Sequence, residues 1–226
     1  MRFLCLHGIW TNNKVLETQT AAMRAELSDE HTYDFVEGTI PWPKAPDLGP
    51  LFSDDDDYFS YFDPSGTLSL QRAISDLRRY IQVEGPFDGI IAFSQGATLA
   101  STFLLAEHGK LDRDQENYSS AFKCAIFLAA GYAWSFDALQ NDEWVRVDKN
   151  SGLRIQIPTA HVWGHNDHLG PDVGTTVVAL CTPDTRYTYI HDEGHTVPGT
   201  RSPEKLNATL KIVRRVIWEG SLATEY

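Results

Sequence analysis

The chain has 226 residues, 42% of them hydrophobic, and a formal charge of −12 from 31 acidic and 19 basic residues, which suits one α/β domain over residues 1–226. This charge repels a phosphate backbone and an anionic lipid surface, so it argues against nucleic acid or a membrane as partner. No stretch approaches the roughly 20 apolar residues of a membrane helix, and three scattered cysteines make no disulfide framework, so we expect a cytoplasmic protein.

Apolar strands and amphipathic helices alternate along the sequence. Strands are predicted at 2–6, 32–38, 89–93, 124–130, 159–164 and 186–191. Helices are predicted at 13–27, 96–108 and around two runs of apolar residues at helical spacing: Leu70, Ile74, Leu77, Ile81 and Leu206, Leu210, Val213, Ile217. This order predicts a mostly parallel central sheet with helices on both faces, whose chemistry lies at the carboxyl ends of the strands.

Two long segments interrupt the alternation. Residues 38–66 contain five prolines, four consecutive aspartates and several aromatic residues, and a connection of this length is usually functional or mobile. We expect it to cover a pocket. Residues 132–157 carry Trp134, Phe136 and Trp144.

The stretch "AFSQG" places Ser94 between an apolar strand and a helix of small residues. A serine that attacks a substrate must project from a sharp strand-to-helix turn, and such a turn needs small neighbours because strand and helix approach closely. Ala92 and Gly96 meet this need. The pentapeptide alone is weak evidence, but its position between strand and helix favours a nucleophilic Ser94.

An acid and a histidine follow in the order that such a fold requires. Asp167 comes after the strand at 159–164, and His195 comes after the strand at 186–191. His195 would take the proton of Ser94, and Asp167 would orient the imidazole. His191 competes with His195 for the role of base, and Asp172 competes less strongly with Asp167 because it stands where a helix begins.

The turn "HGIW" after the first strand predicts the remaining part of the site. We expect the backbone N–H groups of Ile9 and Gln95 to form an oxyanion hole, with Trp10 as the alternative to Ile9. His7 is expected to brace this turn rather than to transfer protons.

Rival chemistries fit the sequence less well. "HDEGH" lacks the glutamate that must directly follow the first histidine of a zinc protease motif, and Gly194 argues against a helix there. His161 falls within a strand and His165 and His168 in the loop after it, so we do not expect them to share a metal. The four aspartates lack the alternating ligands of a calcium loop, and no glycine-rich phosphate loop is present. We therefore predict neither metal nor cofactor.

Four motifs together resemble the FSH-type serine hydrolases, a family of small α/β-hydrolases common in fungi. They are "FLCLHG", "AFSQGA", "GHNDHLGP" and "DEGHTVP", and the resemblance spans nearly the whole chain. It implies an α/β-hydrolase fold with Ser94 as nucleophile, Asp167 as acid and His195 as base. It also implies relatives that are carboxylesterases or thioesterases releasing polyketide chains. The chain departs from the family at Ala92, where glycine is more usual, and at "HGIW", where "HGF" is frequent.

The prediction is a serine hydrolase that cleaves an ester or an acyl thioester through an acyl-enzyme. The acyl group is expected to lie among Trp10, Tyr61, Phe62, Trp134 and Val197. An acyl carrier domain is a further candidate partner, for which a basic helix face would be needed: Arg72, Arg78 and Arg79, or Lys211, Arg214 and Arg215. The alternative is a non-catalytic ligand receptor or scaffold on a hydrolase fold.

Overall fold

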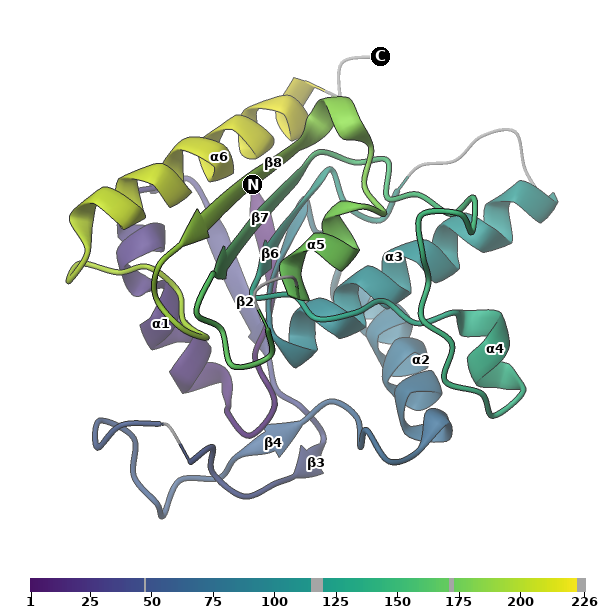
Figure 1. Cartoon of the computed structure of the whole chain (residues 1–226), viewed down its shortest axis with the longest axis horizontal. Helices are drawn as coiled ribbons and strands as arrows, with labels where there is room; N and C mark the ends of the chain where they lie inside the picture. Colours follow the sequence, from purple (N-terminus) through teal and green to yellow (C-terminus); the bar gives the residue numbers. More distant parts are fainter. Residues whose placement is uncertain (47, 115–119, 171–172, 223–226) are drawn as a thin grey trace.

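A parallel six-stranded sheet forms the centre of the computed structural model, which describes residues 1–46, 48–114, 120–170 and 173–222 (Figure 1). The strand order is β2-β1-β5-β6-β7-β8. The strands are β1 (Arg2–Leu6), β2 (Thr32–Val36), β5 (Gly89–Phe93), β6 (Cys124–Leu128), β7 (Thr159–Gly164) and β8 (Arg186–His191). All neighbouring pairs run parallel, so the carboxyl ends of the strands meet at one edge. The α/β-hydrolase fold predicted from the sequence is confirmed.

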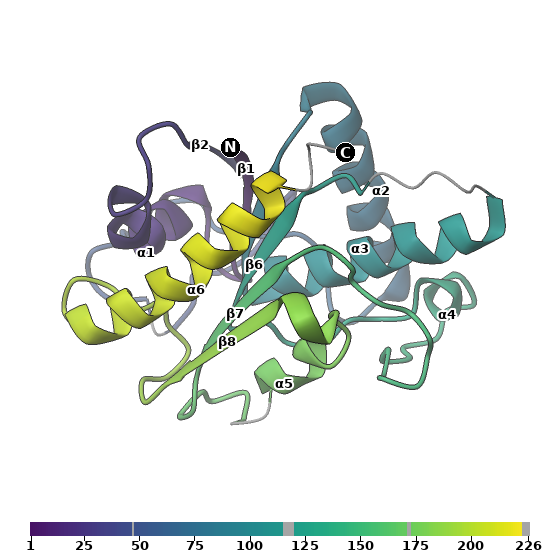
Figure 2. The ribbon, with the colours of Figure 1, turned by 90° about the horizontal axis from the view of Figure 1, so that it is seen from above.

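Helices cover both faces of the sheet, as the edge-on view in Figure 2 shows. One face carries α1 (Asn13–Ala25) and α6 (Pro203–Leu222). The other carries α2 (Thr67–Glu84), α3 (Gln95–Asp114), α4 (Phe136–Gln140) and α5 (Val173–Val178). The apolar core accordingly forms two clusters, one on each side of the sheet. None of the described helices combines the length and the apolar character needed to cross a bilayer.

The local sequence explains why these elements form where they do. Every residue of β5 is buried, which suits a central strand that is covered by helices on both faces. Helix α1 begins where the Asn12 side chain accepts a hydrogen bond from the backbone N–H of Val15, at 2.9 Å. The predicted strand at 89–93 and those at 159–164 and 186–191 are confirmed residue for residue. Helix α3 is longer than predicted, since it begins at Gln95 and continues to Asp114.

Residues 38–66 form a separate small element beyond the carboxyl edge of the sheet (Figure 1). Within it, β3 (Ile40–Pro41) pairs antiparallel with β4 (Phe59–Ser60). The segment is tied to the turn after β1, because the N–H of Trp10 donates to the carbonyl of Phe59 at 3.1 Å and the N–H of Phe59 donates to the carbonyl of Thr11 at 2.8 Å. These bonds place the end of the segment beside the strand ends where the chemistry is expected.

The burial pattern of α2 predicts the effect of a core substitution. Ile74 is fully buried in the cluster between α2, α3 and the sheet, whereas Leu68 on the same helix is 62% exposed. We expect Ile74→Ala to lower the free energy of unfolding by about 2–5 kcal/mol because it leaves a cavity. Leu68→Ala should change it by less than about 0.5 kcal/mol. Urea denaturation measures both, and equal effects would contradict the described packing of α2.

Candidate active site

Ser94 stands at the junction of β5 and α3, in a backbone conformation that side chains rarely adopt. Its φ is +51°, in the left-handed region, and its N–H donates to the carbonyl of Leu128 at 2.9 Å. Helix α3 starts at the next residue. This strained turn lifts the side chain of Ser94 out of the sheet and above the N-terminus of the helix.

Gly96 allows α3 to approach β1 closely enough to make this turn. A Cβ atom at residue 96 would lie 2.5 Å from the carbonyl oxygen of Leu6 and 2.6 Å from that of His7. The N–H of Gly96 instead donates to the carbonyl of His7 at 3.1 Å. Any side chain at residue 96 would therefore push the helix away from the strand.

His195 lies between Ser94 and Asp167 and is hydrogen-bonded to both. Its Nε2 is 2.9 Å from the Oγ of Ser94, and its Nδ1 is 2.6 Å from Oδ2 of Asp167. Asp167 follows β7 and His195 follows β8, so three loops at the carboxyl edge of the sheet bring these side chains together. The arrangement can move a proton from the serine to the imidazole while the carboxylate holds the ring.

The Asp167 carboxyl is held in its ionised form. Burial by itself would raise its pKa, but the hydrogen bonds from His195 and from the backbone N–H of Leu169 (2.9 Å to Oδ1), together with the nearby His168 ring, bring the pKa below its usual value. An ionised carboxylate at this position favours the imidazole tautomer that carries its proton on Nδ1. The Nε2 atom of His195 is then free to accept the proton of Ser94.

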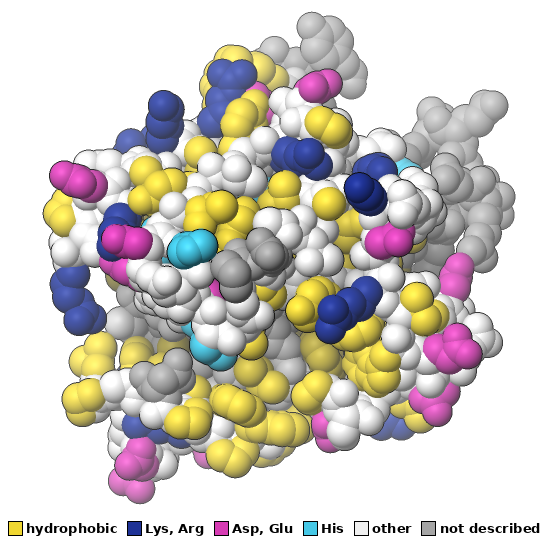
Figure 3. All heavy atoms as spheres, in the orientation of Figure 1, with side chains coloured by type: hydrophobic (Ala, Val, Ile, Leu, Met, Phe, Trp, Pro, Cys, Tyr) yellow, Lys and Arg dark blue, Asp and Glu magenta, His cyan; other side chains and the backbone are white. Residues whose placement is uncertain are grey.

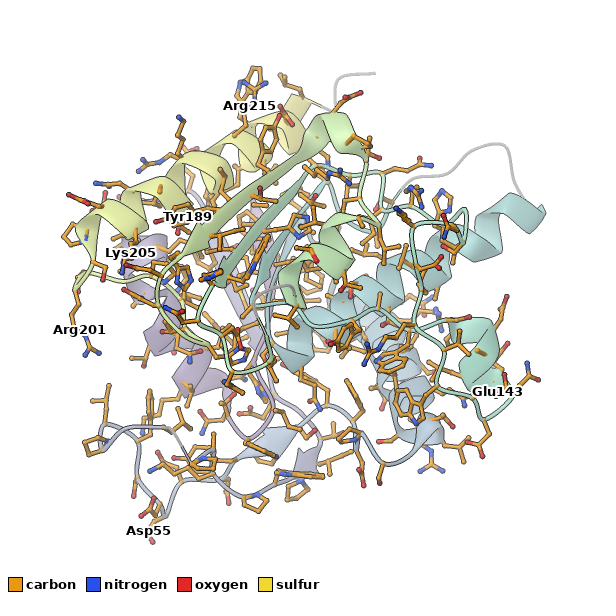
Figure 4. All side chains as sticks on the ribbon, viewed as in Figure 1. Asp55, Glu143, Tyr189, Arg201, Lys205 and Arg215 are labelled. Carbon is orange, nitrogen blue, oxygen red and sulfur yellow. The ribbon has the colours of Figure 1, made fainter. Side chains whose placement is uncertain are left out.

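The loop that carries His195 is fixed by a close backbone contact and by ion pairs. A Cβ atom on Gly164, the last residue of β7, would lie 2.1 Å from the carbonyl oxygen of Glu193. Lys205, labelled in Figure 4 at the start of α6, forms ion pairs with Asp192 and with Glu193, the latter at 3.0 Å. The loop is thus attached to both a strand end and a helix.

The turn after β1 is braced by His7 and Tyr61, which contact each other and not Ser94. Nδ1 of His7 donates to the carbonyl of Gly8 (2.7 Å), and its Nε2 accepts from the N–H of Gly38 (2.9 Å). The Tyr61 hydroxyl accepts from the His7 N–H at 2.8 Å and donates to the carbonyl of Val36 at 2.6 Å. Burial raises the pKa of the Tyr61 phenol well above its usual value, so it remains a neutral donor.

Backbone N–H groups near Ser94 differ in whether they already have an acceptor. The N–H of Trp10 donates to Phe59, whereas the N–H groups of Ile9 and Gln95 find no acceptor within the described part of the chain. Ile9 and Gln95 both line the cleft that contains Ser94. This difference favours Ile9 over Trp10 as the second donor beside Gln95.

The cleft above Ser94 has a volume of about 370 Å³, within the range of small-molecule sites. Apolar and aromatic side chains form most of its wall. On the face of the molecule seen in Figure 3, many hydrophobic side chains lie in the lower half. The lining residues are Ile9, Phe62, Pro64, Ser94, Gln95, Thr98, Gly131, Tyr132, Trp134, Trp144, Leu169 and Val173.

Three of the five residues predicted to bind substrate do not line this cleft. Phe62 and Trp134 do, but Tyr61 faces His7 instead, because its hydroxyl is held by the N–H of His7 and the carbonyl of Val36. Trp10 is 37% exposed and held by backbone bonds to the 38–66 segment. Val197 packs in the core cluster beside α6.

The competing site residues lie elsewhere or outside the described residues. His191 is buried at the end of β8, and burial lowers its pKa; it makes no described contact with Ser94. Asp172 lies outside the described residues. His161 stacks on Phe127 inside the sheet, and its burial lowers its pKa to about 3. Ligand atoms of Asp167, His168 and His195 lie within 4.8 Å of one another, but the Asp167–His195 hydrogen bond already accounts for this grouping.

Three of the cleft-lining residues that sequence reasoning missed come from the segment after β6. Gly131 and Tyr132 line the cleft from this strand end, and Trp144 reaches it from the same long segment. The rule that chemistry gathers at carboxyl strand ends applies to β6 as it does to β5, β7 and β8. This rule could have predicted from the sequence that Gly131 and Tyr132 belong to the site.

A parallel α/β sheet with a serine, a histidine and a carboxylate at its carboxyl edge defines a serine hydrolase. The family model described as "Serine hydrolase (FSH1)" matches residues 1–205. The chain belongs to this family of enzymes, as its four sequence motifs predicted.

Two curated relatives and one solved structure illustrate the similarity. The chain is 38% identical to "Esterase FPY3" of Fusarium mangiferae over 224 residues, covering 96% of this chain and 97% of the relative. It is 29% identical to "Hydrolase phiM" of a fungal species (strain ATCC 74256), covering 93% and 94% of the two chains. A carboxylesterase from Mesorhizobium loti shares the fold, with a TM-score of 0.58, 15% identity and coverage of 94% and 88%.

The contact at Gly164 predicts how a methyl group added at residue 164 affects turnover. In Gly164→Ala, the new Cβ would meet the carbonyl oxygens of Glu193 and Gly194, so the loop bearing His195 must move. We expect esterase kcat to fall by roughly 100-fold, because a displacement of about 1 Å at a catalytic group has that effect. Gly194→Ala is the control, since its Cβ would meet nothing closer than 3.7 Å. Equal rates for the two variants would contradict the described loop contact.

The lowered pKa of Asp167 predicts a pH dependence of stability. In the unfolded chain the Asp167 carboxyl has a pKa of about 3.9, and in the folded chain its pKa is lower. Its ionised form therefore contributes fully to the free energy of unfolding above about pH 3.9, and this contribution is lost as the pH falls through the folded-state pKa. The free energy of unfolding of the wild type, relative to Asp167→Asn, should therefore decline below about pH 4. Denaturant titrations between neutral and acid pH measure this difference. A constant difference over that range would show that Asp167 has an unshifted pKa.

Proposed function

We propose that the enzyme hydrolyses a carboxylic ester or an acyl thioester through an acyl-enzyme on Ser94. The observation that carries the proposal is the continuous hydrogen-bonded chain from Ser94 through His195 to Asp167, at 2.9 and 2.6 Å, beside an apolar cleft. A strained serine at φ +51°, above a helix N-terminus, supports the same role.

The reaction consists of two acyl transfers. Oγ of Ser94 bonds to the acyl carbonyl carbon while its proton passes to Nε2 of His195. The imidazolium, stabilised by Asp167, then gives this proton to the departing alcohol or thiol as the bond to the acyl carbon breaks. A water molecule then attacks the acyl carbon while its proton passes to His195. The bond from the acyl carbon to Oγ breaks, His195 returns the proton to Oγ, and the carboxylic acid and free Ser94 are released.

The oxyanion that forms in each transfer would be bound by the backbone N–H groups of Ile9 and Gln95. Both belong to residues that line the cleft, and neither N–H has an acceptor within the described residues. Donors that are already in position cost no reorganisation when the charge develops, which is the main source of their effect.

The acyl group would occupy the cleft above Ser94. The side chains of Phe62, Tyr132, Trp134 and Trp144 give it an aromatic lining. Such a surface suits a medium-length apolar or conjugated acyl chain, of the fatty or polyketide kind, in fungal secondary metabolism. The name "Esterase FPY3" of a relative supports the ester-cleaving activity.

The helix faces considered for an acyl carrier domain are less basic than the sequence suggests. Arg78 pairs with Glu107 at 2.6 Å, and Arg215 pairs with Glu219 at 2.6 Å. The side chain of Arg214 donates to the carbonyl of Glu26. With these cations engaged, a freely diffusing ester or thioester is favoured over a carrier-bound one.

Substitution of Ser94 tests the proposal directly. We expect Ser94→Ala to lower the hydrolysis rate of matched octanoyl esters and thioesters by at least about 10⁴-fold, because the nucleophile is lost. Intact-mass measurement should find an acyl or organophosphorus adduct on the wild type and none on the variant. Ser101→Ala is the control, since Ser101 is a buried serine of the same helix that bonds to the carbonyl of Thr98.

The same experiment separates the enzyme from a ligand receptor on the same fold. Failure of the folded wild type to form an organophosphorus adduct would favour the receptor. Equal turnover by Ser94→Ala and wild type would refute the assignment of Ser94. The ratio of ester to thioester rates in the wild type distinguishes an esterase from a thioesterase.

A further inference from the structure

Arg146 is an exposed cation that lies against the aromatic wall of the cleft. Its guanidinium carbon is 3.5 Å from the centre of the Tyr132 ring and 5.8 Å from that of the Trp134 ring. Tyr132 and Trp134 both line the cleft that contains Ser94. The charge of Arg146 is therefore separated from the proposed acyl site by little more than an aromatic side chain.

The backbone holds Arg146 at this position. Residues 133–135 and 145–147 run antiparallel, with Trp134 and Arg146 as a bridged pair. The N–H of Ser135 donates to the carbonyl of Val145 at 2.8 Å, and the N–H of Val147 donates to the carbonyl of Ala133 at 2.9 Å. The two segments thus place the arginine directly beside the aromatic residues, and Trp134 packs edge-on against Trp144 with ring centres 4.7 Å apart.

Stacking on Tyr132 orders the guanidinium without using its hydrogen-bond donors. The guanidinium carbon lies over the ring at 3.5 Å, and a cation–π contact of this kind uses none of the five N–H donors of the group. Within the described residues, Arg146 forms no hydrogen bond or ion pair. Glu143, a nearby acid in the sequence, lies at the outer edge of the molecule beyond α4 (Figure 4).

We infer that Arg146 binds an anionic oxygen group of the substrate, a carboxylate or a phosphate, next to the aromatic cleft. This inference rests on the proposed function, because it assigns a substrate feature to the same site. A planar guanidinium matches both anions with paired hydrogen bonds. A chain of net charge −12 would otherwise repel such a substrate, and a local cation beside the cleft offsets this repulsion.

The anion could belong to either half of the substrate, and three matched thioesters distinguish the sources. The octanoyl thioester of N-acetylcysteamine is neutral. The suberoyl monothioester of N-acetylcysteamine adds a carboxylate at the far end of the acyl chain. The octanoyl thioester of phosphopantetheine instead carries a phosphate on the leaving thiol. We would measure kcat/KM of each for wild type, Arg146→Gln and Arg146→Lys.

Arg146→Gln should lower kcat/KM about tenfold for the anionic thioester whose charge Arg146 binds, and change the neutral one by less than about twofold. Arg146→Lys should give an intermediate loss, because it keeps the charge but not the planar donors. Arg201→Gln, an exposed arginine at the opposite edge of the molecule from α4 (Figure 4), is the control for net charge and should change kcat/KM of all three thioesters by less than about twofold. An equal loss for all three in Arg146→Gln would overturn the inference and show that Arg146 only orders the aromatic wall. No loss for any would overturn it as well.

Binding without turnover separates this inference from the proposed function. Tryptophan fluorescence titrations in the Ser94→Ala background give Kd for the same three thioesters, since Trp134 and Trp144 line the cleft. We expect Arg146→Gln to weaken binding of an anionic thioester selectively, by a similar factor. If the wild type cleaves none of the thioesters, the hydrolase proposal fails for these substrates, and the Kd values still decide the role of Arg146.

Discussion

The active site depends on close approaches of backbone to backbone at the carboxyl edge of the sheet. Gly96 lets α3 pass over the end of β1, and Gly164 lets the loop after β8 pass over the end of β7. At each position the neighbouring atoms are main-chain carbonyls, which cannot move aside as a side chain can. These contacts set the distance between Ser94, which precedes Gly96, and His195, which lies on the loop above Gly164.

Gln95 connects this rigid turn to the segment that forms one wall of the cleft. Its side-chain oxygen accepts from the N–H of Tyr61 at 2.9 Å and from the hydroxyl of Ser60 at 3.0 Å, and its amide donates to the carbonyl of Phe62 at 2.8 Å. The residue that follows the nucleophile thereby holds the end of the 38–66 segment. The position of Phe62 at the cleft is thus coupled to the geometry of the strand-to-helix turn at Ser94.

Charge is distributed unevenly around this site. The cleft wall is mostly apolar, and the charge of the buried Asp167 is stabilised by hydrogen bonds from His195 and from the backbone N–H of Leu169. The chain as a whole carries a net charge of −12, so an ordered cation beside the cleft affects which substrates can approach. Arg146 is such a cation, and it links specificity to the same antiparallel segment that supplies Trp134.

By itself the sequence determined the order of the six sheet strands and of the four long helices, the strand-to-helix turn at Ser94 and the order in which Asp167 and His195 follow it, because each is a local pattern with a local physical cause. Only the tertiary structure decided which side chains line the cleft. Tyr61 and Phe62 are adjacent and similar, yet one braces His7 and the other lines the cleft, because contacts with His7 and Gln95, which are distant in sequence, fix each of them in place. The pairing of residues 133–135 with 145–147, which brings Arg146 beside Tyr132, likewise depends on a contact between separate segments that no local pattern records.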